Sequence, residues 1–149
     1  MEIRNQMKIA FMSLPENLSL ARVTVASFAA QLDFTLEDLE EIKVAISEAV
    51  SNCIIHGYEN DVNRTVNIVC TIYGDYLEMS VEDEGKGIAD VASALQPAFS
   101  TDPERMGLGF TFMQSFMDKL DVHSGVNKGT RVVMSKRPQS AAAATSEEN

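Results

Sequence analysis

The chain contains no tryptophan, only two cysteines, few basic residues and no long hydrophobic run. Its 149 residues include 12 Lys and Arg against 22 Asp and Glu, which gives a net charge of −10. Phosphate contacts need clustered basic side chains, and these are scattered, so the sequence argues against direct nucleic-acid binding. Apolar runs are short, and no basic N-terminal segment precedes one. We therefore expect no membrane span and a cytoplasmic protein.

The scarcity of cysteine argues against a disulfide framework or a zinc site. Cys53 and Cys70 lie inside apolar segments, without a C-x-x-C pair or a Cys/His cluster. We predict that both are reduced thiols in a protein core. The 45% apolar and 23% charged residues are typical of a globular protein. We expect a single domain over residues 1–137 and a disordered tail over 138–149, which is rich in Ala, Ser and Glu.

A polar row on an otherwise apolar helix is predicted between residues 46 and 57. Residues four apart share a helix face, so Glu48, Asn52 and His56 line up. An acid and an amide that face inward are costly to desolvate unless a polar group lies against them, which favours a ligand. Taken alone, the row is more typical of solvated or locally bonded side chains.

Two later segments favour the ligand. The sequence DEGKG at 83–87 follows an alternating strand, and GLGF at 107–110 opens a predicted helix. Each alone is typical of turns. In this order, over residues 7–137, they resemble the N, G1 and G2 boxes of the nucleotide-binding domain shared by gyrase-type ATPases, Hsp90, histidine kinases and MutL. SEAVSNCIIHGY, VEDEGKGI, QPAF, GLGFTFMQSFMD and VNKGT further resemble anti-sigma factors of spore-forming bacteria, which are serine kinases that also inhibit a sigma factor.

Periodicity and turn residues predict helices near the N-terminus and in the middle of the chain, with strands concentrated afterwards. The expected helices cover residues 16–32, 35–56 (capped by Thr35 and ended by Gly57) and 107–120, and the strands cover 7–14, 66–73, 76–83, 121–124 and 130–136. This order predicts a two-layer α+β sandwich. The resemblance implies a Bergerat-type ATP-binding fold: a mixed sheet with helices on one face, and ATP held beneath a mobile lid at 88–106.

The adenine end of the expected site is formed by DEGKG and a late strand. An ionised Asp83 only accepts hydrogen bonds, which suits the exocyclic amine of adenine; the alternative is a surface Asp beside a turn. Gly85 and Gly87 allow backbone to press against a purine ring. Thr130 resembles the family threonine that reaches the base through water, although a strand Thr needs no such role.

The phosphate end is formed by the two helix segments. Asn52 offers an oxygen to Mg²⁺, and Glu48 is placed to act as the general base of phosphoryl transfer. By resemblance, Arg105 lies near the γ-phosphate, although the segment that carries it is shorter than in the relatives. The backbone N–H groups expected to bind phosphate belong to Gly107, Leu108, Gly109 and Phe110. His56 and Cys53 receive no role.

The resemblance implies an ATP- and Mg²⁺-dependent serine kinase. It would phosphorylate an anti-anti-sigma factor and hold a sporulation sigma factor of the sigma-F type. Arg22 matches a family arginine on the partner-binding face, although an ordinary solvated charge would look the same. The first strand matches the dimer-forming segment, so we expect a homodimer. The alternatives are a general-stress (sigma-B type) anti-sigma kinase, a gyrase- or MutL-type ATPase, a detached histidine-kinase domain, and a nucleotide-gated binding module without turnover.

Overall fold

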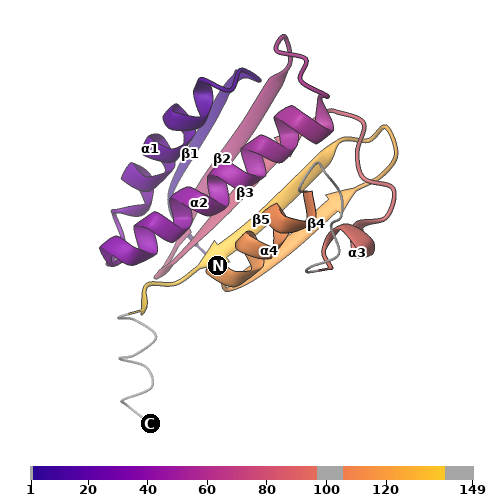
Figure 1. Ribbon diagram of the computed structural model, residues 1–149. Coiled ribbons are helices and arrows are strands. Elements are labelled where there is room, and N and C mark those ends of the chain that lie inside the picture. Colours follow the sequence, from indigo (N-terminus) through magenta and orange to yellow (C-terminus); the bar gives the residue numbers. More distant parts are fainter. Residues whose placement is uncertain (1, 97–105, 140–149) are drawn as a thin grey trace.

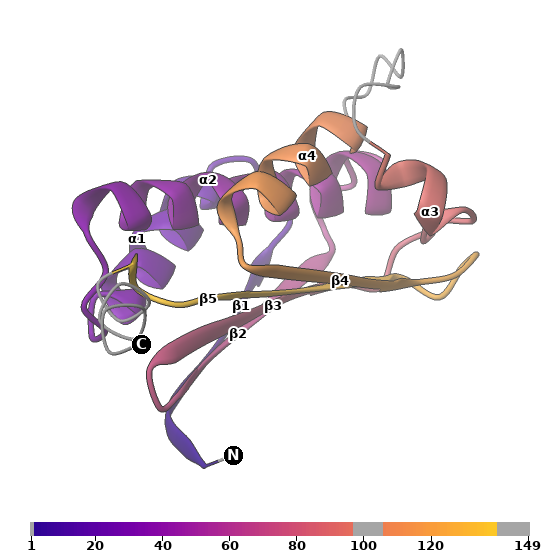
Figure 2. The same cartoon turned by 90° about the horizontal axis from the view of Figure 1, so that it is seen from below.

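The computed structural model describes residues 2–96 and 106–139, which form two layers (Figures 1 and 2). A five-stranded sheet carries helices on one face, as Figure 2 shows, and its strand order is β1-β2-β3-β5-β4. The strands are β1 (Ile3–Met12), β2 (Thr65–Tyr73), β3 (Tyr76–Asp83), β4 (Lys119–Ser124) and β5 (Thr130–Lys136). The helices are α1 (Asn17–Ala29), α2 (Leu36–Asn52), η1 (Cys53–Gly57), α3 (Val91–Ala94) and α4 (Met106–Phe116). The two-layer α+β sandwich is confirmed.

All neighbouring strands in this sheet are antiparallel, whereas a mixed sheet was expected. β3 and β4 run in the same direction and are joined through α4, the arrangement that normally gives a parallel pair. Here β5 lies between them and pairs with both. The hairpins fit the prediction: Gly74 has φ +53° in the β2–β3 turn, and Gly129 has φ +71° before β5.

Backbone pairing moves two element boundaries away from their predicted positions. β1 begins at Ile3, because its polar first half already pairs with β2. α4 ends at Phe116 instead of Leu120, because the N–H of Asp118 donates to the carbonyl of Ser135 (2.9 Å). From this bond onward the chain pairs with β5. Leu120 is therefore a half-buried strand residue.

The long helix α2 begins as predicted but ends differently. Thr35 Oγ1 accepts the N–H of Asp38 (3.0 Å), and Asp38 Oδ2 accepts the N–H of Thr35 (3.1 Å), which completes a capping box. The α-helix ends at Asn52, and the chain continues as the π-helical turn η1. Gly57 belongs to this turn and has no positive φ, so it is not the predicted C-cap. A Cβ there would lie 2.8 Å from the Asp83 carboxyl group, so close approach explains this glycine.

The core lies between the helices and the covered face of the sheet. α1, α2, β2, β3, α4 and β5 contribute fully buried side chains, which include Val25, Ile42, Ile46, Val50, Ile68, Ile72, Leu77, Met79, Phe110, Met113 and Met134. Both cysteines are free and buried, as predicted. Across residues 2–96 and 106–139, no helix has the length and apolar character that a membrane span needs.

The predicted lid and tail are described only in part. The described part of the lid includes the single helical turn α3, where Asp90 Oδ1 accepts the N–H of Ser93 (3.1 Å). Residues 97–105, which include Arg105, lie outside the described residues, as do residues 140–149 of the predicted tail.

Candidate nucleotide-binding site

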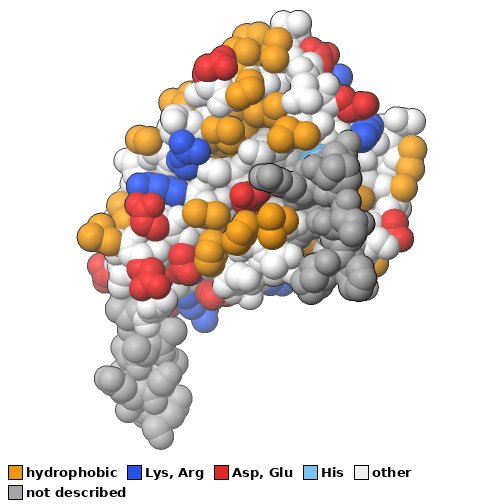
Figure 3. Space-filling view, in the orientation of Figure 1, with side chains coloured by type: hydrophobic (Ala, Val, Ile, Leu, Met, Phe, Trp, Pro, Cys, Tyr) orange, Lys and Arg blue, Asp and Glu red, His pale blue; other side chains and the backbone are white. Residues whose placement is uncertain are grey.

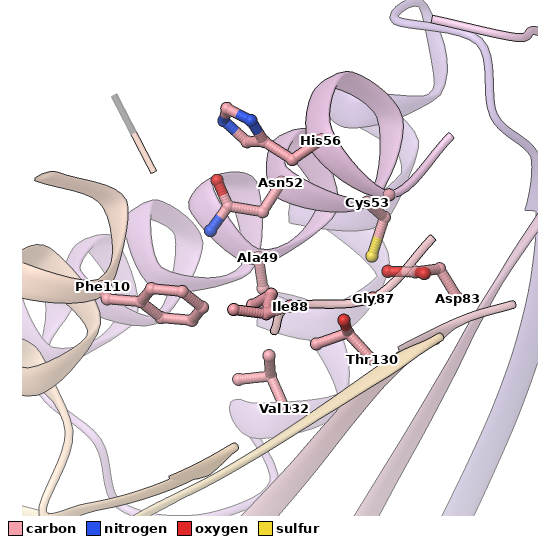
Figure 4. A pocket seen from close by; sticks show the side chains of 11 residues that line it. Ala49, Asn52, Cys53, His56, Asp83, Gly87, Ile88, Phe110, Thr130 and Val132 are labelled. Atoms are coloured by element: carbon pink, nitrogen blue, oxygen red, sulfur yellow. The ribbon is translucent and has the colours of Figure 1, made fainter. Parts of the chain in front are cut away.

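A pocket lies between the C-terminal end of α2, the ends of β3 and β5, and the start of α4 (Figure 4). It contains about 330 Å³ of empty space, which includes its opening to solvent. Its lining brings together predicted site residues from all three boxes: Asn52, Asp83, Gly87, Phe110 and Thr130. The residues that complete the lining are Ala49, Cys53, His56, Gly57, Ile88 and Val132.

Asp83 lines one end of this pocket, and the residue is only 4% exposed. Burial is the largest influence and raises the pKa of Asp83 above its ordinary value. Hydrogen bonds from the N–H of Gly85 (2.8 Å to Oδ1), from Cys53 and from Thr130 act in the opposite direction. The group can accept a hydrogen bond from a ligand amine, which would offset its desolvation.

The DEGKG glycines pack the turn against neighbouring backbone. A Cβ at Gly85 would lie 2.1 Å from the carbonyl oxygen of Gly57, the oxygen that accepts the N–H of Lys86 (3.0 Å). Gly87 has φ +75°, and a Cβ there would lie 1.9 Å from the carbonyl oxygen of Gly125. Gly87 lines the pocket, whereas Gly85 supports it from behind by packing on η1.

Thr130 is held in one orientation by Ser124. Ser124 Oγ accepts the N–H of Ile88 (2.7 Å) and donates to the carbonyl of Gly129 (2.8 Å). Because the only hydroxyl proton of Ser124 is donated to Gly129, Thr130 Oγ1 is the donor in its 2.8 Å contact with Ser124 Oγ. The Thr130 oxygen is left as an acceptor beside the pocket, which suits a bridging water or a ligand N–H.

At the α4 end of the site, Glu48 and Asn52 lie against the first turns of α4, and of these two only Asn52 lines the pocket. A Cβ at Gly109 would lie 3.0 Å from Glu48 Oε2 and 3.4 Å from Asn52 Nδ2. Gly107 also lies in this helix, whereas the side chain of Leu108 is 46% exposed. Phe110 is 1% exposed, and its ring lines the pocket. Since α4 begins at Met106, the free N–H groups belong to residues before Phe110.

The residues at this end fit a nucleotide phosphate and a Mg²⁺ ion. Asn52 Nδ2 is buried and has no hydrogen-bond partner among the described residues. A phosphate oxygen would satisfy this donor, and Oδ1 would remain for a cation. Within the described ranges, no three His, Cys, Asp or Glu side chains gather as a metal site. A Mg²⁺ ion held by Asn52 would therefore take its other ligands from the nucleotide and water.

Several lining residues were missed in the sequence. His56 was given no role, but it is 4% exposed and lines the pocket. Cys53 follows Asn52 and lies four residues after Ala49, the same spacing that relates Glu48, Asn52 and His56. Helical spacing alone could therefore have predicted that Cys53 and His56 lie near the same site. Ile88 directly follows DEGKG, whereas nothing in the sequence distinguishes Val132 from other core residues.

Comparison with known proteins identifies the class to which this chain belongs. The family model of the histidine kinase-like ATPase domain matches residues 11–136, and the chain belongs to that family. It is 52% identical over 136 residues to the anti-sigma F factor of Anoxybacillus flavithermus, covering 90% of this chain and 93% of that protein. The match to the anti-sigma F factor of Thermoanaerobacter sp. strain X514 is 52% over 138 residues, covering 91% and 96%. Within its class, the chain is a member of the anti-sigma F factor family.

Solved structures support the fold. The RsbU and RsbW domains of a Mycobacterium tuberculosis protein match with a TM-score of 0.63 and 20% identity, covering 89% of this chain and 32% of that one. The blue-light activated histidine kinase of Erythrobacter litoralis matches with a TM-score of 0.56 and 20% identity, covering 74% and 34%.

Proposed function

We propose that this protein is an ATP-dependent serine kinase and an anti-sigma factor. It would phosphorylate an anti-anti-sigma factor and hold a sporulation sigma factor of the sigma-F type. One observation carries the kinase part: Glu48 and Asn52 on α2 both lie against Gly109 of α4, and Asn52 lines the same pocket as Asp83. The names of the anti-sigma F factor relatives support the inhibitory part.

Each end of the pocket has a distinct task in this proposal. When bound, ATP would supply the transferable phosphoryl group, and Mg²⁺ would neutralise the charge of the phosphate oxygens. Asp83 accepts the adenine amine, and Asn52 holds the phosphate end. Glu48 Oε2, beside Gly109, takes the proton from the attacking serine hydroxyl. Arg105 precedes α4 in the chain, and we assign to it the stabilisation of charge on the transferred group.

The partner-binding surface is proposed to lie on α1. Arg22 is half-buried and donates to Ser47 (3.2 Å) and Ser19 (3.1 Å), so its guanidinium group is held in place. Leu20 and Val23, on the same helix, are 51% and 65% exposed. Figure 3 shows hydrophobic side chains over the region that α1 occupies in Figure 1. A fixed charge beside exposed apolar side chains is suited to a protein partner.

A homodimer is part of the proposal, with the first strand at its interface. β1 lies at one edge of the sheet, where it pairs with β2 on one side only. An edge strand presents unpaired backbone groups that a second chain can use.

The test is incubation of the protein with γ-labelled ATP, Mg²⁺ and a small anti-anti-sigma protein, followed by identification of the labelled residue. Phosphoserine on the partner is the expected result. Label released only as free phosphate would replace the kinase with an ATPase. ATP retained without turnover would indicate a nucleotide-gated binding module, and preferential capture of a general-stress sigma factor would replace the sporulation assignment.

Two variants separate binding from transfer. Glu48→Gln should bind ATP normally and lose phosphoryl transfer by roughly 10²–10⁴-fold, because it removes the general base. Asn52→Ala should lose Mg²⁺-dependent nucleotide binding, which titration calorimetry with and without Mg²⁺ measures. Glu40→Gln is a matched control on the exposed side of the same helix and should behave as the parent protein. Unreduced transfer by Glu48→Gln would require a different base, and tight Mg²⁺-ATP binding by Asn52→Ala would remove the metal assignment.

A further inference from the structure

The two cysteines are equally buried but have different neighbours. Cys70 is 0% exposed within β2, and burial alone raises the pKa of its thiol to about 12. Cys53 is 3% exposed on η1, lines the nucleotide pocket, and has its sulfur directed at the Asp83 carboxyl group (Figure 4). A side-chain hydrogen bond joins Cys53 and Asp83.

The direction of this hydrogen bond follows from the protonation of the thiol. Burial, and after it the nearby charge of Asp83, raises the pKa of Cys53 well above its ordinary value. The thiol therefore keeps its proton at neutral pH. A protonated thiol beside a carboxylate donates S–H to oxygen, and the carboxylate accepts.

The orientation of the Asp83 carboxyl group depends on how many of its partners hold it, and from which directions. The terminal torsion of an aspartate is broad, so one hydrogen bond leaves the plane of its carboxyl group free to rotate. The N–H of Gly85 holds Oδ1 at 2.8 Å, and the absence of a side chain at Gly57 lets the group lie against η1. The backbone of Thr130 on β5 is a second donor, and Cys53 adds a third from η1, so the carboxyl plane is held from three directions.

We propose that Cys53 is a positioning residue for nucleotide selection: its thiol holds Asp83 in the orientation that accepts the exocyclic amine of adenine. This inference rests on the proposed binding of adenine by Asp83. A residue that only filled core volume would affect all nucleotides equally. A residue that aims the carboxylate affects only those that carry the amine, which makes the two roles distinguishable.

The experiment measures affinity for two nucleotides by titration calorimetry. The nucleotides are ATP and purine riboside 5′-triphosphate, which lacks only the exocyclic amine. Cys53→Ala should weaken ATP binding roughly three- to tenfold, the range for one modest hydrogen bond, and leave the analogue unchanged. Cys53→Ser, which restores a shorter donor, should recover part of the ATP affinity. Cys70→Ala, the matched control, should keep the parent protein's ratio of ATP to analogue affinity.

Other results would overturn the inference in recognisable ways. An equal loss for both nucleotides in Cys53→Ala, or no loss for either, would leave Cys53 as a core residue. If Cys53→Ala does not fold, Cys53→Val fills the volume without a donor and makes the same comparison. If the parent protein itself binds both nucleotides equally, the role of Asp83 in adenine recognition fails before the question of Cys53 arises.

Discussion

At Asp83, burial and hydrogen bonding act on one carboxyl group in opposite directions, and burial has the larger effect on its pKa. The folded-state pKa is therefore raised above the unfolded value. The folded protein holds this proton more tightly, so stability falls as pH rises from the unfolded pKa through the folded one. Above that window the full destabilisation remains, because the ionised carboxylate stays buried.

Replacing Asp83 by Asn should therefore stabilise the protein and remove its nucleotide binding. The amide keeps an oxygen for the N–H of Gly85 but needs no ionisation, so we expect a higher melting temperature at pH 7. The amide NH₂ group meets the adenine amine donor to donor, so ATP affinity should be lost. Thermal unfolding at pH 7 and near pH 4 tests the linkage. The difference in melting temperature between the variant and the parent protein should be smaller at the lower pH. A difference that does not depend on pH would contradict the linkage.

The sequence predicts site residues best where a polar side chain interrupts an apolar helix or follows an apolar strand. Asp83 and Asn52 were predicted in this way and both line the pocket. Cys53 was assigned to the core because a buried thiol is the common case, and only the fold brings it to Asp83. Val132 is an apolar strand residue like its neighbours, so no local pattern could separate it from them.

Among the elements, α2 shows where local rules suffice and where they do not. Its start depends on residues three apart, so Thr35 and Asp38 predict the capping box. Its end depends on what the last turn packs against. Gly57 has the features of a helix stop, but it is glycine because Asp83 approaches from β3, and the helix widens to a π turn there. Likewise, helical spacing through Leu120 predicts a longer α4, and pairing with β5 ends it.

Removing the cap of α2 should reduce stability without changing the site directly. Thr35→Ala loses the acceptor for the N–H of Asp38 and should cost about 1 kcal/mol in the free energy of unfolding. Thr35→Ser keeps the hydroxyl group and serves as the matched control. Urea unfolding measures both, and an equal loss in the two variants would show that the methyl group rather than the cap matters.

At the scale of the whole molecule, Lys136 on β5 connects three elements. It lies at the C-terminal end of α4, whereas the pocket lies near the start of that helix. This side chain is 6% exposed, and Nζ donates to the carbonyl of Phe116 at the end of α4 and to Glu41 Oε1 on α2 (3.3 Å). A lysine placed this deep is stable only with such partners.

Lys136→Met should destabilise the protein by about 1–3 kcal/mol, because it leaves a helix-end carbonyl and a carboxylate without their donor. Lys119→Met is the matched control: its side chain is 72% exposed and lies 3.8 Å from Asp121, so we expect a change within about 0.5 kcal/mol. Chemical denaturation compares the two. A loss at Lys136 no larger than at Lys119 would show that the buried contacts contribute nothing measurable.

The pairing of Asp83 with Thr130 also bears on how the molecule folds. β2 and β3 are joined by a two-residue turn and can pair early, whereas β5 reaches β3 only after the lid, α4 and β4 have been accommodated. Closing so large a loop costs chain entropy before any contact compensates for it. The two residues that would recognise adenine are thus brought together by a late, long-range event. We expect a chain leaving the ribosome to be unable to bind nucleotide until β5 has emerged.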